Sequence, residues 1–219
     1  MRPAVKLARV TLLLRQAYGP RRLLRRRDNP LNALIHTILS QNTSDVNSDR
    51  AYAALRQRFP DWEDVHRAPL RTLISTIRSG GLANIKAVRI KALLEEIWGE
   101  QAHFDLSFLR DLSDDEVRAY LARFKGIGSK TIACVLLFGM GRPAFPVDTH
   151  VFRVSRRLGL VDGRQTPERA QEFLESRIPP DDRHALHLHL VQHGRQVCKA
   201  QRPLCAECVL ARVCASVRA

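Results

Sequence analysis

Hydrophobic residues recur along most of this chain three or four positions apart, the spacing of an α-helix that buries one face. The clearest stripe begins after Pro30, a residue that suits the first turn of a helix, and consists of Leu31, Leu34, Ile35, Ile38 and Leu39. Strand-like alternation of apolar and polar residues is almost absent. The pattern therefore predicts an all-α protein.

Boundary residues divide the rest of the chain into further helices. We expect one helix after the cap Thr43–Ser44–Asp45, and another that stops at Gly80–Gly81. Ser113 and Glu116 have the spacing of a capping box. With an amphipathic helix at the N-terminus, about ten helices are predicted. Apart from that one, their ranges include 31–39, 46–59, 70–77, 114–125, 131–140, 149–158, 167–176 (capped by Thr166) and 182–193.

The charge balance points to a polyanionic partner. The 219 residues include 36 Lys and Arg against 22 Asp and Glu, a formal net charge of +14. Such a field attracts phosphate backbones or anionic lipid surfaces, and we expect the partner to be nucleic acid. The basic run Arg21–Arg22 with Arg25–Arg26–Arg27 is typical of a solvated face.

The sequence predicts a cytoplasmic protein without membrane contact, associated with the nucleoid if the cell is bacterial or archaeal. No apolar run approaches the length of a membrane span, and Val10 to Leu14 is interrupted by Thr11. The basic N-terminal stretch could imitate a transit peptide, but it also suits an amphipathic helix packed on the body. We prefer the helix.

Four of the five cysteines crowd into one segment near the end of the chain. Cys198, Cys205, Cys208 and Cys214 have the spacing C-x6-C-x2-C-x5-C, which lets four thiolates converge on one metal centre. An iron–sulfur cluster is expected before zinc, because structural zinc sites usually present two C-x2-C pairs. Two disulfides are a weaker alternative. Cys134, inside the apolar helix, is expected to be a small buried residue.

Histidines cluster in the helix expected at 182–193. His189 and His193 are one turn apart and could bind zinc, but the H-E-x-x-H spacing of a zinc protease is missing. We expect satisfied helix histidines or phosphate contacts instead.

The segment F-K-G-I-G-S-K-T at 124–131 lies between two expected helices. Glycines at 126 and 128 let the backbone approach a phosphate closely, and the next helix would aim its first N–H groups at the anion. A plain tight turn would look the same, but the surrounding positive charge favours phosphate binding. We therefore expect Gly126, Gly128 and Ser129 to contact DNA.

Two residues could carry chemistry. Lys130 stands just inside a helix N-terminus, where the dipole and partial burial would favour a nucleophilic free amine. Taken alone, a lysine there is more simply a phosphate contact. Asp148, in V-D-T-H, could return beside Lys130, since the helix advances roughly 15 Å and the return can span about 23 Å. Alone, it would be an N-cap for the helix that begins at Thr149.

Together these motifs resemble a known family. The G-I-G-S-K hairpin, V-D-T-H and the closing cysteine pattern, in this order, are similar to endonuclease III, a family of base-excision DNA glycosylases. The resemblance runs from about Leu31 to Cys214. It implies two helical lobes with a DNA groove between them. One is a six-helix barrel domain at 25–141, with a helix-hairpin-helix motif at about 114–140. The other, made of 1–24 and 142–219, would hold one 4Fe-4S cluster on the four cysteines.

The resemblance also implies a bifunctional enzyme that acts on oxidised pyrimidines in duplex DNA. Such enzymes flip the damaged base out, because its anomeric carbon cannot be reached inside the stack. Lys130 would attack that carbon, expel the base and form a Schiff base whose β-elimination breaks the strand. Asp148 would take a proton from the lysine and stabilise the positive sugar. We expect a monomer that binds damaged or abasic DNA.

Two alternatives remain open. Related monofunctional mismatch glycosylases share the hairpin, the aspartate and the cluster but lack the lysine. A non-catalytic helix-hairpin-helix protein would use Lys130 only as a phosphate contact.

Further DNA contacts are implied by two short segments. L-S-Q-N-T-S-D at 39–45 resembles L-S-A-Q-A-T-D, whose glutamine fills the gap left by the flipped nucleotide. Its counterpart is Asn42 by direct alignment, or the adjacent Gln41. G-L-A-N-I-K-A at 81–87 resembles G-L-Y-N-S-K-A, which makes Leu82 an apolar wedge and puts Ala83 where tyrosine is usual.

A basic loop could also meet phosphates. Lys199 and Arg202 lie between the first two cysteines of the pattern, where a cluster would shape the loop. Departures from the family pattern at Lys125, usually proline, and Ser129, usually arginine, concern the substrate range rather than the reaction.

Overall fold

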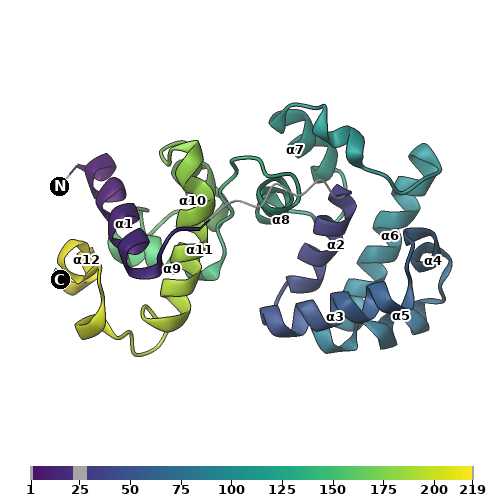
Figure 1. Cartoon of the computed structure of the whole chain (residues 1–219), viewed down its shortest axis with the longest axis horizontal. Helices are drawn as coiled ribbons and strands as arrows, with labels where there is room; N and C mark the ends of the chain where they lie inside the picture. Colours follow the sequence, from purple (N-terminus) through teal and green to yellow (C-terminus); the bar gives the residue numbers. More distant parts are fainter. Residues whose placement is uncertain (1, 22–28, 219) are drawn as a thin grey trace. The chain divides into compact units, whose positions relative to one another are not determined.

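The structure, a computed structural model, describes residues 2–21 and 29–218. In these ranges it holds twelve α-helices, five short segments η1–η5 and no strand, which confirms the predicted all-α fold (Figure 1). The basic residues from Arg22 to Arg27 lie outside the described part. No helix in the described ranges is long and apolar enough to cross a membrane.

The described residues form two compact units. Residues 29–140 make the middle unit, and residues 2–21 with 141–218 make the terminal unit. The middle unit contains α2 (Pro30–Ser40), α3 (Asp45–Arg58), α4 (Trp62–Arg67), α5 (Leu70–Thr76), η1 (Arg78–Gly80), α6 (Ala83–Gln101), η2 (Ser107–Arg110), α7 (Asp114–Ala122), α8 (Ser129–Cys134) and η3 (Val135–Gly139). The terminal unit contains α1 (Pro3–Tyr18), α9 (Thr149–Leu158), α10 (Pro167–Glu175), α11 (Pro180–Gln196), η4 (Cys205–Glu207), η5 (Ala211–Val213) and α12 (Ala215–Arg218).

Helix α2 is the core helix of the middle unit. Its predicted stripe, Leu31 to Leu39, is fully buried, and the helix contacts α3, α6, α8 and η3. Pro30 occupies the first turn, and the Asn29 side chain caps the helix by accepting from the Leu31 N–H at 3.0 Å. The capping box of α7 is also present, with the Ser113 N–H donating to Glu116 at 2.7 Å.

The apolar helix expected at 131–140 is buried as predicted but is not one regular α-helix. It begins at Ser129, and from Val135 its hydrogen bonding widens, as the Met140 N–H donates to the Val135 C=O at 3.0 Å. A Cβ on Gly139 would lie 2.5 Å from the Ala33 Cβ, so this segment packs closely on α2.

Two helices of the middle unit were not predicted. Helix α4 is a short element, whereas α6 is the longest helix described and buries Ala87, Ile90 and Ile97 at helical spacing. Within α3, which begins one residue before the predicted 46–59, Val46 is 67% exposed because it lies in the first turn after the cap Ser44. Leu55, further along the same helix, is buried.

The terminal unit packs around α11. Helix α1 contacts α11 and buries Leu7, Val10 and Leu14, as expected of an amphipathic helix at the N-terminus. Helix α9 also contacts α11, and Asp148 and Thr166 cap α9 and α10 as predicted. Helix α11 is longer than the predicted 182–193, because the turn at Pro180 starts it earlier.

Candidate functional site

Helices α7 and α8 are joined by a hairpin that is anchored by two apolar side chains. Phe124 and Ile127 are 2% and 6% exposed, and the Ile127 N–H donates to the Phe124 C=O at 3.1 Å. Gly126 and Gly128 are exposed. Gly126 has φ +83°, which favours glycine, whereas Gly128 is extended and forms the N-cap of α8. The anchors thus leave the glycine backbone accessible to a ligand.

Lys130 lies in the first turn of α8, directly after this hairpin. Lys130 and Ser129 are partly exposed, whereas Thr131 is 4% exposed. The Thr131 hydroxyl accepts a hydrogen bond from Gln41 Nε2 at 3.3 Å, which ties the start of α8 to the end of α2. The structure therefore places the predicted hairpin residues and Lys130 in one continuous stretch.

Asp148 is the N-cap of α9 in the terminal unit. Its Oδ1 accepts from the Val151 N–H at 2.7 Å, and Asp148 itself is partly exposed. Its second carboxylate oxygen forms no hydrogen bond among the described residues. The cap fixes the carboxylate while leaving one oxygen available.

Side chains of α10 and α11 hold the segment before Asp148, and those of Gln171 and Glu175 were not predicted to do so. Glu175 accepts from the Phe145 N–H at 3.0 Å, and Gln171 accepts from the Val147 N–H at 3.4 Å. Gln171 and Glu175 stand one turn apart on α10, which is the available sequence signal. His187 Nδ1 donates to the Pro146 C=O at 2.9 Å. These contacts order the backbone that leads into Asp148.

Asn42 and Leu82 are exposed residues of the middle unit that have left-handed backbones. Asn42 has φ 52° and follows α2, and Leu82 has φ 49° and precedes α6. Asparagine tolerates this conformation, whereas for leucine it costs about 1–2 kcal/mol. Leu82 is also 50% exposed. A strained backbone that presents an apolar side chain to solvent is typical of a ligand-contacting position.

The neighbouring Gln41 points inward. Besides its hydrogen bond to Thr131, its Oε1 accepts from Arg89 Nη1. The resemblance aligns Asn42 with the DNA-contacting glutamine and leaves the adjacent Gln41 as an alternative. The structure separates them, with Gln41 held by protein partners and Asn42 exposed.

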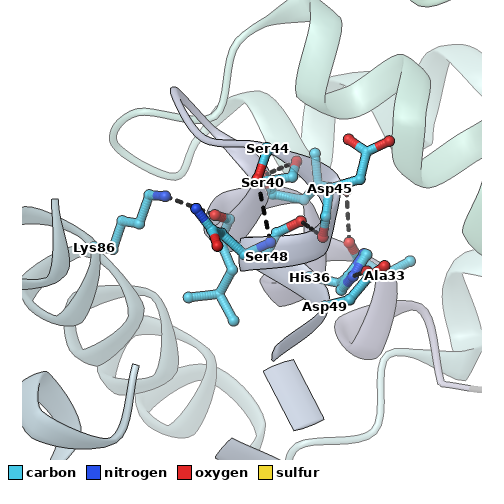
Figure 2. A network of polar contacts seen from close by, with 11 residues as sticks. Ala33, His36, Ser40, Ser44, Asp45, Ser48, Asp49 and Lys86 are labelled. Atoms are coloured by element: carbon cyan, nitrogen blue, oxygen red, sulfur yellow. Dashed lines mark hydrogen bonds and ion pairs between the residues drawn. The ribbon is translucent and has the colours of Figure 1, made fainter. Parts of the chain in front are cut away.

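A buried lysine, Lys86, binds the backbone just before Asn42 and just before Leu82. Lys86 is 2% exposed, and its Nζ donates to the C=O of Leu39 at 2.6 Å and of Gly80 at 2.8 Å. Figure 2 shows Lys86 reaching from its helix toward the polar network where α2 ends and α3 begins. Burial, and then the charge of Arg89, lowers the pKa of Lys86. Lys86 falls at core spacing with Ile90, four positions later on α6, which is the signal in the sequence for its burial.

Three of the four C-terminal cysteines contact residues of α9 or α11. Arg157 Nη1 donates to Cys198 Sγ at 3.4 Å, and Cys214 Sγ donates to the Arg157 C=O at 3.3 Å. Cys208 Sγ lies 3.5 Å from His193 Nε2. Burial, and then the charges of the other three cysteines, raises the pKa of the Cys208 thiol. All are free thiols, so the disulfide alternative is not realised, and Cys134 is buried as predicted.

The basic loop after Cys198 is fastened to α9. Arg157 donates to the C=O of Lys199 at 2.6 Å and of Ala200 at 2.8 Å. Lys199 and Arg202 are exposed, as a phosphate contact requires, and Arg202 has φ 51°. The loop therefore presents its side chains on a fixed backbone.

The histidines of α11 have protein partners. His189 Nε2 donates to the Gly19 C=O at 2.9 Å, and His193 Nδ1 lies 2.8 Å from the Tyr18 hydroxyl. Burial lowers the pKa of His193 to about 4, so the ring is neutral at pH 7. His189 and His193 thus each have a protein partner, although the buried Nδ1 of His189 has no hydrogen-bond partner among the described residues.

Comparison with known proteins decides the family. The model of the HhH-GPD superfamily base excision DNA repair proteins matches residues 35–180, a range that includes the hairpin, Lys130 and Asp148. The chain belongs to this family. It is therefore a DNA glycosylase of base excision repair, as the resemblance to endonuclease III implied.

Several relatives of this glycosylase are endonucleases III. That of Thermotoga maritima is 35% identical over 189 residues, covering 85% of this chain and 83% of the relative. That of Sulfolobus acidocaldarius is 33% identical over 188 residues, covering 85% and 82%. An Arabidopsis thaliana relative is 40% identical over 168 residues, and the chain spans 57% of its length.

Solved structures show the same fold. A non-covalent endonuclease III–DNA complex superimposes with a TM-score of 0.84 at 28% identity, covering 100% of this chain and 98% of that one. A trapped covalent endonuclease III–DNA intermediate has the same TM-score at 27% identity. Both relatives were captured on DNA.

The cysteines fit the iron–sulfur group that the endonuclease III resemblance implies. The donor set is four thiols within one short segment, which is the ligand chemistry that an iron–sulfur cluster takes. Among the described residues, no three His, Cys, Asp or Glu side chains form a ready-made metal site. Cys205 begins η4, Cys208 follows η4, and Cys214 follows η5, so three of the thiols lie at the ends of short elements.

Proposed function

We propose that this glycosylase excises oxidised pyrimidines from duplex DNA and then cleaves the strand as an AP lyase. The main support is the position of Lys130, which is partly exposed in the first turn of α8, directly after a glycine hairpin whose backbone is accessible. The endonucleases III at 33–35% identity support the same chemistry for this chain. A covalent DNA intermediate was trapped for a relative with the same fold, and such an adduct needs a nucleophile.

The proposed reaction starts with the free amine of Lys130. Its nitrogen attacks the anomeric carbon of a flipped nucleotide, and the glycosidic bond breaks, with the base leaving with the bonding electrons. Opening of the sugar ring gives a protonated Schiff base on Lys130. Loss of a proton from the adjacent sugar carbon then expels the 3′ phosphate, which breaks the strand.

Asp148 would assist both parts of this reaction. Its cap hydrogen bond to Val151 fixes the carboxylate, and the oxygen outside the cap can accept a proton from the lysine ammonium. Its negative charge would also stabilise the positive sugar that develops as the base leaves. Lys130 and Asp148 belong to different units, and their cooperation is part of the proposal.

Backbone and side-chain contacts to DNA complete the proposal. Gly126, Gly128 and Ser129 would hold a phosphate at the hairpin. Leu82 would enter the base stack as an apolar wedge, which its 50% exposure allows. Lys199 and Arg202, exposed on the fixed loop, would meet the phosphate backbone.

We further propose that Cys198, Cys205, Cys208 and Cys214 hold one 4Fe-4S cluster. When bound, the cluster supplies a structural crosslink that shapes the basic loop. Four thiols on short turns suit this group, and zinc is the alternative metal.

Borohydride trapping tests the proposed function. The full chain is incubated with duplexes that carry an oxidised pyrimidine or an abasic site, and a Schiff base becomes a stable protein–DNA band on reduction. We expect the band for the parent chain and none for Lys130→Ala or Lys130→Arg, because guanidinium is a poor nucleophile. Lys125→Ala removes a nearby exposed charge and should still give the adduct at saturating protein.

Each other outcome selects an alternative. Base release without an adduct would make the chain a monofunctional glycosylase. Binding without release, and unchanged in Lys130→Arg, would leave Lys130 as a phosphate contact in a protein that only binds DNA.

A further inference from the structure

We propose that Arg89 and Gln41 are positioning residues, which hold the hairpin and the start of α8 in the geometry that Lys130 needs. This inference rests on the proposed function and deepens it. Neither residue would touch the reacting atoms. Both belong to the middle unit, as does Lys130.

Arg89 reaches from α6 to the hairpin glycine. A Cβ built on Gly126 would lie 2.5 Å from Arg89 Nε and 2.7 Å from Cζ, so the guanidinium lies directly against this residue. The φ of +83° favours glycine at position 126, and any larger residue there would also have to displace the guanidinium. The contact couples the tip of the hairpin to a long helix.

Gln41 links Arg89 to the residue that follows Lys130. Its Oε1 accepts from Arg89 Nη1, and its Nε2 donates to Thr131 Oγ1 at 3.3 Å. In the described residues, the Arg89 guanidinium has no other hydrogen bond. The contacts therefore connect Gly126 at the hairpin tip, through Arg89 and Gln41, to Thr131, the residue after Lys130.

This arrangement gives Gln41 and Asn42 different tasks. If Gln41 entered the DNA, it would lose both hydrogen bonds and leave Arg89 and the buried Thr131 without these partners. Asn42 is exposed in a left-handed turn and can move without breaking such contacts. The amide at position 41 thus fixes the site, and the adjacent amide is free for DNA.

Single-turnover trapping tests the inference. The rate of Schiff-base formation on an abasic duplex is measured at saturating protein for Arg89→Ala, Gln41→Ala, their double variant and Thr131→Val. A small displacement of a reacting group costs a large factor in rate, so we expect each single variant to be slower by roughly tenfold or more. The rate of the double variant should be within about twofold of that of the slower single variant, because each single substitution already breaks the same chain of contacts.

Two controls separate positioning from loss of charge or packing. Thr131→Ser keeps the hydroxyl and should restore the rate. Arg71→Ala removes an exposed arginine that makes no hydrogen bond or ion pair among the described residues, and it should leave the rate unchanged. If Arg89→Ala keeps the parent rate but lowers the salt slope of DNA binding by about one, Arg89 is a phosphate contact and the inference is wrong. The inference is also wrong if the rate reduction in the double variant equals the product of the reductions in the two single variants, because the two residues would then act independently.

Amide exchange distinguishes this inference from the proposed function. In the free protein, Arg89→Ala and Gln41→Ala should speed exchange at residues 126–131 and leave α9 as in the parent. If the parent chain forms no adduct, the proposed function is refuted. Faster amide exchange in the two variants would still show that Arg89 and Gln41 hold the hairpin and the start of α8. If exchange at residues 126–131 is unchanged in both variants, Arg89 and Gln41 do not hold this segment, whether or not the chain forms an adduct.

Discussion

Replacing Lys86 by methionine would remove the buried ammonium that joins the ends of two helical segments. The C=O groups of Leu39 and Gly80 belong to the last turns of α2 and η1, where carbonyls lack helical partners. A cation also suits this end of a helix. Methionine has a similar length, so the change tests the hydrogen bonds rather than the packing.

The expected cost follows from these two contacts. A hydrogen bond from a charged donor contributes about 1.5–3 kcal/mol, and Lys86 makes two, at 2.6 and 2.8 Å. Burial of the ammonium offsets part of this, as its lowered pKa shows. We therefore expect Lys86→Met to destabilise the middle unit by about 2–4 kcal/mol.

Urea unfolding followed by tryptophan fluorescence measures this effect. Both tryptophans of the chain, Trp62 and Trp98, lie in the middle unit, so the signal reports on that unit. With a typical urea slope, the midpoint should fall by about 1–2 M. The side chain of Lys125 is exposed and makes no hydrogen bond or ion pair in the described part, so Lys125→Met should change the free energy of unfolding by less than about 0.5 kcal/mol.

The pH dependence provides a second check. The pKa of Lys86 is lower in the folded than in the unfolded chain, so between these two values the unfolded chain binds more protons. The stability of the parent relative to Lys86→Met should therefore rise with pH in this alkaline window, and the neutral amine can still donate both hydrogen bonds. A variant as stable as the parent, or a difference that shrinks as pH rises, would refute the reasoning.

Three further changes test other parts of the site. Asp148→Asn can still accept from the Val151 N–H, so stability should hold, while base excision slows by about 10²-fold or more; a normal excision rate would remove Asp148 from the mechanism. Gly126→Ala should destabilise the middle unit by about 1–3 kcal/mol in urea, since its φ is +83° and its Cβ would displace Arg89; parent-like stability would contradict the hairpin geometry. The parent chain purified without air should be brown and contain about four irons, and Cys208→Ser should lose colour and iron; zinc in place of iron would refute the cluster.

Much of the helical framework could be predicted from the sequence, because it depends on near neighbours. Pro30 and the stripe of α2, the capping box at Ser113 and the cap at Asp148 involve residues within a few positions of one another. The two glycines of the hairpin likewise predict a sharp turn. Helix α6 has the same apolar spacing, but its N-terminus is harder to predict because its N-cap, Leu82, has no capping side chain.

Which polar residues face inward was decided by the tertiary structure. Gln41 meets Thr131 and Arg89 at sequence separations of 90 and 48, and no local pattern encodes those meetings. Lys86 is buried because two helix ends offer their carbonyls to it, although lysine alone predicts exposure. The sequence by itself thus determined the helices, the hairpin and the types of reactive residue. Only folding determined which amide is fixed beside Lys130 and which is exposed, because burial and hydrogen bonding depend on distant parts of the chain.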